Sequence, residues 1–229
     1  MPVRKKAPED LTAKKALALE VIRRLKAEYP DAGCTLDYDH AWQLLVSVRL
    51  AAQCTDARVN IVVEELFAKY PSVAALAAAE PEDIEAIVKP CGLGHSKARD
   101  ISACMRMLRD KYACRVPDTF DELLALPGVG RKSANLIMGD VFGKPAIVTD
   151  THCIRLCNKI GLVDGIKEPQ KVEMALWKII PPEEGSDLCH RFVMHGRAVC
   201  NARKPECEKC CLKDICRTAR EAAGQQTEP

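Results

Sequence analysis

The sequence contains no long run of apolar residues. No stretch approaches the roughly 20 consecutive apolar residues that a membrane-spanning helix needs. The opening residues, MPVRKKAPED, include no apolar segment of the kind found in secretory signals. We therefore expect a soluble protein of the cytoplasm. With 229 residues, 48% of them hydrophobic, the chain is long enough to bury a core without disulfide bonds.

The chain also has little net charge. A formal charge of +2 gives no indication of a polyanionic partner, but the distribution of the charges does. Residues 191–217 hold seven Lys or Arg against Glu206, Glu208 and Asp214, which leaves this segment at +4 and the rest of the chain at −2. A basic segment in an otherwise near-neutral protein indicates a surface for a polyanion.

Apolar residues recur at helical spacing through most of the chain. The clearest run comprises Val59, Val62, Val63 and Leu66. Helix start signals agree with this pattern, since Asp39 precedes the run 40–53, Ser72 precedes 73–79 and Pro81 opens the next run. Only 146–150, AIVTD, looks extended, and it is too short to found a sheet. The sequence therefore predicts an all-α protein.

Thirteen cysteines in a cytosolic chain indicate buried thiols, a metal or catalysis, because disulfides are rare in that compartment. Four of them form a C-x6-C-x2-C-x5-C run: Cys200, Cys207, Cys210 and Cys216. A metal would neutralise the repulsion between four converging thiolates. Structural zinc usually takes two close pairs of ligands, whereas this run has one close pair and is compatible with an iron–sulfur cubane. The spacing favours iron only slightly and leaves zinc open.

The segment NARKPE lies between the first two of these cysteines and carries Arg203 and Lys204. Surface lysines and arginines are usually just solvated. A loop that a metal holds at both ends loses less entropy when its cations meet phosphates. We therefore predict that Arg203 and Lys204 contact DNA.

The stretch LPGVGRKSAN, residues 126–135, has a helix-forming run on each side. Gly128 and Gly130, with Val129 between them, allow the backbone to approach a partner closely, and the first amides of the following helix attract phosphate. Arg131 adds a cation at the same turn. We predict a helix-hairpin-helix element that binds DNA through its backbone, whatever the base sequence.

A second stretch, GLGHSKARDI from Gly92, aligns with GVGRKSANLI from Gly128 without a gap. The match has two interpretations. Glycines followed by an alanine suit any tight turn into a helix, so the similarity can be chance. The functional interpretation is that both turns hold the same bent duplex.

Lys132 lies in the first turn of the second hairpin helix, where the helix dipole disfavours a cation. An ordinary lysine is neutral in roughly one molecule in a thousand at pH 7.4, and only the neutral amine is a nucleophile. Burial and the neighbouring Arg131 would also favour the neutral form. Asp150, expected at the N-cap of a further helix, would remain ionised and could stabilise positive charge on a sugar. A capping aspartate is more often only structural.

Together, LPGVGRKSAN, TDTH, LAAQCTD and the cysteine run resemble the endonuclease III family of base-excision DNA glycosylases, from about residue 15 to Cys216. The resemblance implies two helical domains with a DNA cleft between them. A six-helix barrel with the helix-hairpin-helix would span 34–145. A discontinuous domain, 1–33 and 146–229, would hold a 4Fe-4S cluster on the four cysteines.

The resemblance also implies a bifunctional DNA glycosylase and abasic-site lyase that removes oxidised pyrimidines. Lys132 would attack the sugar C1′, and Asp150 would be the essential carboxylate. Gln53 would fill the space left by the extruded nucleotide, and Leu93 would enter the duplex as an apolar wedge. The plainer alternatives are a solvated helix glutamine and a core leucine.

The expected partner is duplex DNA with damaged bases or abasic sites, bound by a monomer with no membrane association, at the nucleoid if the source is bacterial. Two other functions remain. A monofunctional mismatch adenine glycosylase shares the hairpin, the aspartate and the cluster, but it lacks a lysine at position 132. A non-catalytic helix-hairpin-helix protein would use the hairpin for phosphate and zinc for rigidity.

Overall fold

The computed structural model describes residues 11–224, and every regular element in that range is a helix. The prediction of an all-α protein is therefore confirmed. The segment 146–150, expected to be extended, runs without regular structure. Within the described range, no helix combines the length and the apolar character needed to cross a bilayer.

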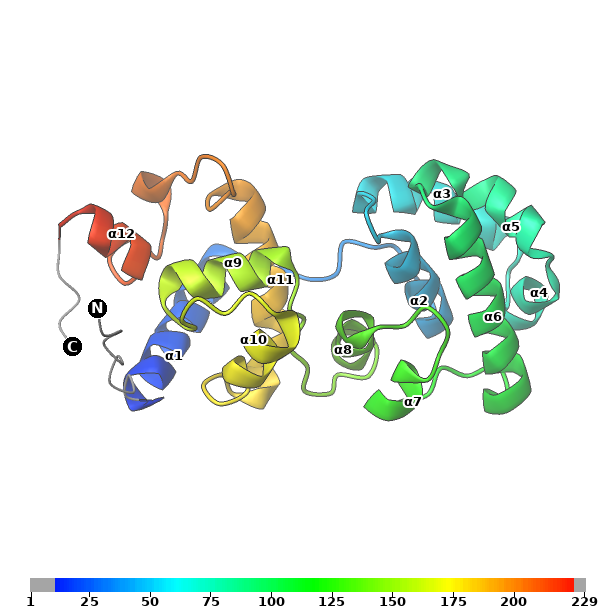
Figure 1. Cartoon of the computed structure of the whole chain (residues 1–229), viewed down its shortest axis with the longest axis horizontal. Helices are drawn as coiled ribbons and strands as arrows, with labels where there is room; N and C mark the ends of the chain where they lie inside the picture. The colour runs from blue at the N-terminus through cyan, green and yellow to red at the C-terminus, as the bar shows by residue number, and fades with distance from the viewer. Residues whose placement is uncertain (1–10, 225–229) are drawn as a thin grey trace, which may run out of the picture. The chain divides into compact units, whose positions relative to one another are not determined.

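The chain divides into two compact units, each described by itself. One unit comprises residues 34–144. Its helices are α2 (Ala41–Leu50), α3 (Asp56–Lys69), α4 (Val73–Ala78), α5 (Pro81–Val88), the short η1 (Lys89–Cys91), α6 (Gly94–Tyr112), α7 (Phe120–Leu124) and α8 (Arg131–Asp140) (Figure 1).

Helix α6 is the centre of this unit and packs against α2, α4 and α5 (Figure 1). Its apolar positions recur every three or four residues, so one face of the helix is buried: Ala98, Ile101, Met105 and Leu108. The helix ends at Ala113 and Cys114, whose left-handed φ angles of 49° and 62° turn the chain out of the helix.

Two of the three predicted helix starts are confirmed, and the third is wrong by one residue. The Ser72 hydroxyl accepts a hydrogen bond from the Ala75 amide at 3.1 Å, and Pro81 is the first residue of α5. Helix α2 begins after His40 rather than Asp39. The Gln43 side-chain oxygen accepts from the amides of both Asp39 and His40, so the cap comes from inside the helix.

The other unit holds the described residues on either side, 11–33 and 145–224; the first ten and last five residues of the chain lie outside the described part. Its helices are α1 (Leu11–Glu28), α9 (Thr151–Ile160), α10 (Pro169–Leu176), η2 (Pro182–Glu184), α11 (Gly185–Ala198), η3 (Cys207–Lys209) and α12 (Arg217–Ala222). Helix α11 packs against both α1 and α9.

Arg24 connects α1 to the cysteine-bearing segment within this unit. Its guanidinium donates to the carbonyl of Cys211 at 2.9 Å and pairs with the Asp214 carboxylate. Glu20, one turn earlier on α1, accepts from Arg24 at 2.7 Å. One side chain therefore fixes the position of the residues that follow Cys210.

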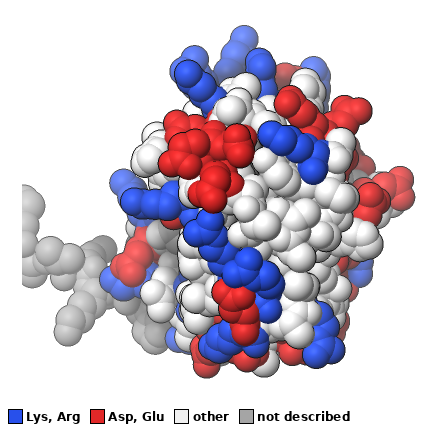
Figure 2. Space-filling view, turned by 90° about the vertical axis from the view of Figure 1, so that its right-hand side faces the viewer, with Lys and Arg blue, Asp and Glu red and all other residues white. Residues whose placement is uncertain are grey.

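The face that Figure 2 shows, at the end of the molecule where α4 and α5 lie, carries acidic and basic side chains interspersed with uncharged ones. Such a mixture gives no continuous field of one sign. This face therefore offers no extended basic surface to a polyanion.

Candidate functional site

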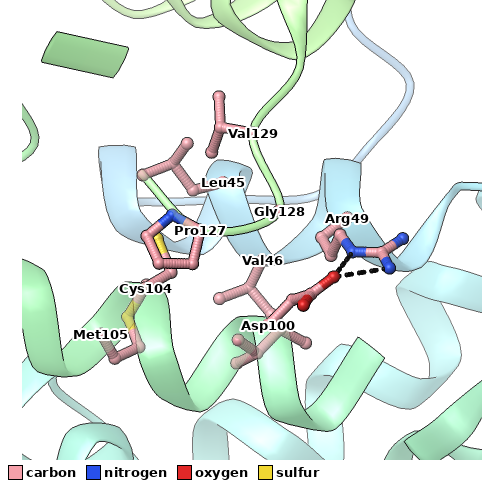
Figure 3. A pocket seen from close by; sticks show the side chains of 10 residues that line it. Leu45, Val46, Arg49, Asp100, Cys104, Met105, Pro127, Gly128 and Val129 are labelled. Atoms are coloured by element: carbon pink, nitrogen blue, oxygen red, sulfur yellow. Dashed lines mark hydrogen bonds and ion pairs between the residues drawn. The ribbon is translucent and has the colours of Figure 1, made fainter. Parts of the chain in front are cut away.

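The hairpin turn between α7 and α8 requires glycine at position 128. Gly128 has a φ of +74°, and a Cβ there would lie 2.9 Å from the Asp100 Cβ and 3.1 Å from the Arg49 Cδ. Both the backbone angle and the lack of space exclude a side chain. Figure 3 shows the turn above the Arg49–Asp100 ion pair, beside an apolar hollow lined by Leu45 and Met105.

Gly130 is a different case. It is the N-cap of α8 with φ −97° and ψ 176°, and a Cβ there would meet no atom within 4 Å. The protein itself therefore has no steric need for glycine at this position. Gly130 supplies no side-chain cap, so the first amides of α8 face outward at the positive end of the helix dipole. This arrangement is suited to an anion that approaches the backbone closely.

Arg131 and Lys132 follow at once on α8. The Arg131 guanidinium lies 4.8 Å from the centre of the Phe120 ring, a cation–π contact that orders its side chain. Lys132 is exposed, contrary to the burial that the sequence suggested. Its amine is therefore accessible to a partner.

The sequence match between the two glycine turns extends to their conformation. Gly92 and Gly128 both have a φ of +74°, and each turn leads directly into a helix. Helix α6 begins at Gly94, whereas α8 begins one residue later than the matching Gly130. The two turns are therefore related in geometry but differ at the helix start.

Gln53 and Leu93 are both exposed and both have left-handed backbones, with φ angles of 57° and 51°. The expected helix over 40–53 is too long, because α2 ends at Leu50 and Gln53 lies in the following turn. Leu93 immediately precedes α6 and is 56% exposed, which excludes the alternative of a core leucine. Left-handed conformations cost energy for residues with a side chain, so the surrounding structure must maintain both.

Asp150 is the N-cap of α9, as predicted. Its carboxylate accepts a hydrogen bond from the Cys153 amide at 2.7 Å, and its own backbone is extended. The side chain is half-buried and its second oxygen has no assigned role in the cap. Asp150 belongs to the unit of 145–224, and Lys132 belongs to the unit of 34–144.

The four cysteines of the C-x6-C-x2-C-x5-C run line one hollow. Two lysine side chains share its wall, Lys159 and Lys213. Within residues 11–224 no three His, Cys, Asp or Glu side chains converge closely enough to hold a single metal ion.

Neighbouring groups fix two of these cysteines. The Cys210 sulfur lies 3.3 Å from Nε2 of His195, whose Nδ1 contacts the Tyr29 hydroxyl at 3.1 Å. Burial lowers the pKa of His195, so its ring is neutral at pH 7. Arg155 of α9 donates to the Cys200 carbonyl at 2.9 Å. The helix that Asp150 caps thus also holds the first cysteine of the run.

Arg203 and Lys204 are exposed on the loop between Cys200 and Cys207. The Asn201 side chain closes this loop, since it donates to the Lys204 carbonyl and accepts from the Lys204 amide, each at 2.6 Å. The Glu206 amide adds a bond to the Val199 carbonyl at 2.9 Å. Protein contacts therefore order the loop in addition to any metal.

Three residues near these elements were not predicted from the sequence: Arg49, Lys97 and Asn201. Arg49 supports the hairpin turn from α2, a contact with no local sequence signal. Lys97 lies within the repeated glycine motif, which is the one signal that could have indicated it. Asn201 could have been found, because asparagine commonly closes turns through its side chain.

Comparisons with known proteins agree with this set of elements. Residues 46–182 match the family model described as HhH-GPD superfamily base excision DNA repair protein. Endonuclease III of Synechocystis sp. is 41% identical over 91% of this chain and 95% of its own length. A non-covalent endonuclease III–DNA complex is 40% identical with a TM-score of 0.86, covering 92% of this chain and 98% of that one. A trapped endonuclease III–DNA covalent intermediate has the same identity and TM-score, covering 91% and 98%.

Proposed function

Because the chain belongs to the endonuclease III family of the HhH-GPD superfamily, it is a DNA glycosylase and abasic-site lyase of base excision repair, and we propose that Lys132 is its nucleophile. The observation that carries this proposal is the exposed amine of Lys132 in the first turn of α8, directly after an uncapped glycine turn. The trapped covalent DNA intermediate of a relative shows that a bond between protein and DNA forms in this family.

The reaction requires a neutral amine. The Lys132 nitrogen attacks C1′ of the deoxyribose, and the damaged base leaves with the electron pair of the glycosidic bond. The lone pair of the lysine nitrogen then breaks the bond between C1′ and the ring oxygen O4′, which takes up the proton that the amine loses. A Schiff base between Lys132 and C1′ results. Removal of a proton from C2′ then breaks the C3′–O bond, which cuts the strand on the 3′ side, and water releases the lysine.

Asp150 is proposed as the second catalytic residue. The cap hydrogen bond that it accepts from the Cys153 amide fixes one carboxylate oxygen in direction. A fixed carboxylate stabilises the positive charge that develops on the sugar as the glycosidic bond breaks. The half-buried position strengthens this effect, because water screens the charge less than at an open surface.

Extrusion of the damaged nucleotide is assigned to the turns of the unit 34–144. The turn formed by Gly128, Val129, Gly130 and Arg131 would hold a phosphate, which fixes the register on the strand. Gln53 would occupy the space that the extruded nucleotide leaves, and Leu93 would enter the opposite side of the duplex. Arg203 and Lys204 would add phosphate contacts from the other unit.

The cysteine hollow is proposed to hold a 4Fe-4S cluster through Cys200, Cys207, Cys210 and Cys216. The four thiols line one shared hollow, and their spacing has one close pair where structural zinc usually takes two. Lys159, which also lines the hollow, would offset part of the negative charge of the thiolates. When bound, the cluster supplies a rigid anchor for the loop that carries Arg203 and Lys204. A broad brown absorbance with four irons per chain would support this assignment, and a colourless zinc protein would overturn it.

Trapping with sodium borohydride tests the assignment of Lys132. Wild-type protein incubated with a duplex containing one abasic site should give a covalent adduct on reduction, and Lys132→Ala should give none. Lys144→Ala is the matched control, because that lysine lies in the same unit and is expected to retain the adduct. An adduct that persists in Lys132→Ala would refute the assignment.

The substrate is proposed to be an oxidised pyrimidine. Duplexes with thymine glycol, dihydrouracil, an abasic site or an adenine mismatch would rank the lesions directly. Release of the two oxidised pyrimidines together with strand cleavage supports the proposal. Release of adenine without strand cleavage would instead indicate the monofunctional alternative. Such a substrate would place the protein with the genome, at the nucleoid of a bacterium.

A further inference from the structure

Lys97 is a buried cation at the start of α6. Its side chain is 0% exposed, and its ammonium donates to the carbonyl of Leu50 at 2.8 Å and to the carbonyl of Cys91 at 2.9 Å. Burial lowers the pKa of Lys97, which reflects the cost of removing the charge from water. A buried lysine persists only where its donors are satisfied, and these two bonds serve that need.

Both acceptors lie at the ends of helices. Leu50 is the last residue of α2, and Cys91 is the last residue of η1. The final carbonyls of a helix lack partners within the helix and carry partial negative charge. The ammonium of Lys97 therefore compensates two helix ends at once and fixes the distance between them.

The chain leaves these two helix ends as the turns that carry Gln53 and Leu93. Gln53 follows Leu50 by three residues, and Leu93 follows Cys91 by two. Both residues are exposed and have left-handed backbones, which only the surrounding structure can maintain. Lys97 is thus bonded to the backbone three residues before Gln53 and two residues before Leu93.

We propose that Lys97 is a positioning residue that holds the turns of Gln53 and Leu93 in one fixed arrangement, so that both enter the duplex together. The inference rests on the proposed function for its assignment of Gln53 and Leu93 to the opened duplex. Lys97 touches neither DNA nor the reacting sugar in this account. Its effect reaches the reaction through the two turns.

The same helix provides a matched control. Arg106, farther along α6, donates to the carbonyls of Ala77 at 3.2 Å and Ala79 at 3.5 Å. It too joins α6 to the end of another helix, α4. No residue assigned to DNA follows these carbonyls, so Arg106 shares the structural role of Lys97 without the proposed positioning role.

The test is a double-mutant cycle on strand cleavage of a duplex with one abasic site. Lys97→Met should slow cleavage by about tenfold to a hundredfold, as expected when reacting groups are misplaced. Leu93→Ala should slow cleavage in wild type but add little in the Lys97→Met background, because the wedge is already out of place. In the Arg106→Met background, Leu93→Ala should retain its full effect.

Two results would overturn the inference: unchanged cleavage by Lys97→Met, or additive effects of Lys97→Met and Leu93→Ala. If Leu93→Ala alone leaves cleavage unchanged, the assignment of the wedge fails instead, and the two failures are distinct. Circular dichroism establishes that each variant is folded. Should Lys97→Met unfold, Lys97→Gln replaces it in the cycle, because its side-chain amide can still donate to one of the two carbonyls. The effects of Lys97→Gln and Leu93→Ala should then also be non-additive, with a smaller departure from additivity.

Discussion

The guanidinium of Arg49 lies 2.8 Å from the carboxylate of Asp100, and Gly128 of the hairpin turn packs directly against both side chains. Arg49 also donates to the Ser96 hydroxyl at 3.2 Å. The ion pair joins α2 to α6 and forms the surface on which the turn between α7 and α8 rests. The hairpin turn is thus supported by charged side chains from two other helices.

The two hairpin glycines should respond differently to alanine. Gly128→Ala combines an unfavourable φ with a clash against Arg49 and Asp100, so we expect it to lower the free energy of unfolding by about 2 to 4 kcal/mol. At position 130 the added methyl group meets open space and the backbone φ is permitted for alanine. Gly130→Ala should therefore change the free energy of unfolding by less than about 0.5 kcal/mol.

Gly130→Ala should nevertheless weaken binding to duplex DNA, because the added methyl group keeps a phosphate away from the first amides of α8. Urea denaturation and a fluorescence titration with a short duplex measure the two effects separately. Normal affinity in Gly130→Ala would contradict the assignment of this turn to phosphate.

Asp150 allows its structural and chemical roles to be separated. Asn and Asp cap helices about equally well, so Asp150→Asn should leave the free energy of unfolding nearly unchanged, whereas Asp150→Ala should lower it by about 1 kcal/mol. Both variants should lose at least about 10²-fold in the rate of base release, since neither has a carboxylate. The check is single-turnover base release on a thymine glycol duplex. A wild-type rate of base release in Asp150→Asn would show that Asp150 only caps the helix and takes no part in the chemistry.

The loop between Cys200 and Cys207 should contribute to DNA affinity in two ways. Arg203→Ala and Lys204→Ala should each remove one phosphate contact and so reduce the magnitude of the slope of log affinity against log salt by about 1. Asn201→Ala should weaken affinity with the cations in place, because the loop loses two hydrogen bonds of 2.6 Å. Lys209→Ala is the control, since that lysine is already paired with Glu206 at 2.6 Å. If Arg203→Ala and Lys204→Ala change the slope no more than Lys209→Ala does, Arg203 and Lys204 are merely solvated and do not contact phosphate.

The Arg24 network should make stability depend on acid. Hydrogen bonds from Arg23 and Arg24 lower the pKa of Glu20 from 4.5 to about 2, and the bond from Arg24 lowers the pKa of Asp214. Both carboxylates have a lower pKa in the folded state, so their stabilisation is complete above pH 4.5 and is lost as the pH falls toward 2.

The difference in Tm between wild type and Arg24→Gln should therefore be constant from pH 5 to 8 and should shrink below about pH 4.5. Arg23→Gln is the comparison variant, because it removes bonds to Glu20 but none to Asp214. Its Tm difference should shrink below the same pH through Glu20 alone. A Tm difference that stays unchanged down to pH 3 would exclude this contribution.

The sequence predicts those features that depend on local physics. Helical periodicity and the cap by Asp150 are each encoded within a few residues. The end of α2 is not, because Ala51 and Ala52 are good helix formers. There the chain leaves the helix at Leu50, whose carbonyl bonds to Lys97, a residue distant in sequence.

Whether a side chain is buried or exposed cannot be predicted from a local motif in the same way. Lys97 and Lys132 occupy adjacent positions in the two matching glycine stretches, yet one is fully buried and the other is exposed. The burial of each depends on which helices pack against it. The roles of Lys132, Gln53, Leu93 and the cysteines stay predictions until DNA and metal are bound.

The central claim is that one amine, that of Lys132, becomes bonded to the deoxyribose. The most direct measurement is mass spectrometry of peptides from the borohydride-reduced adduct between the intact protein and a duplex with one abasic site. We predict that the sugar remnant is found on the peptide that contains Lys132 and that the fragment ions assign it to that side chain. A remnant on another lysine or on the terminal amine would contradict the account.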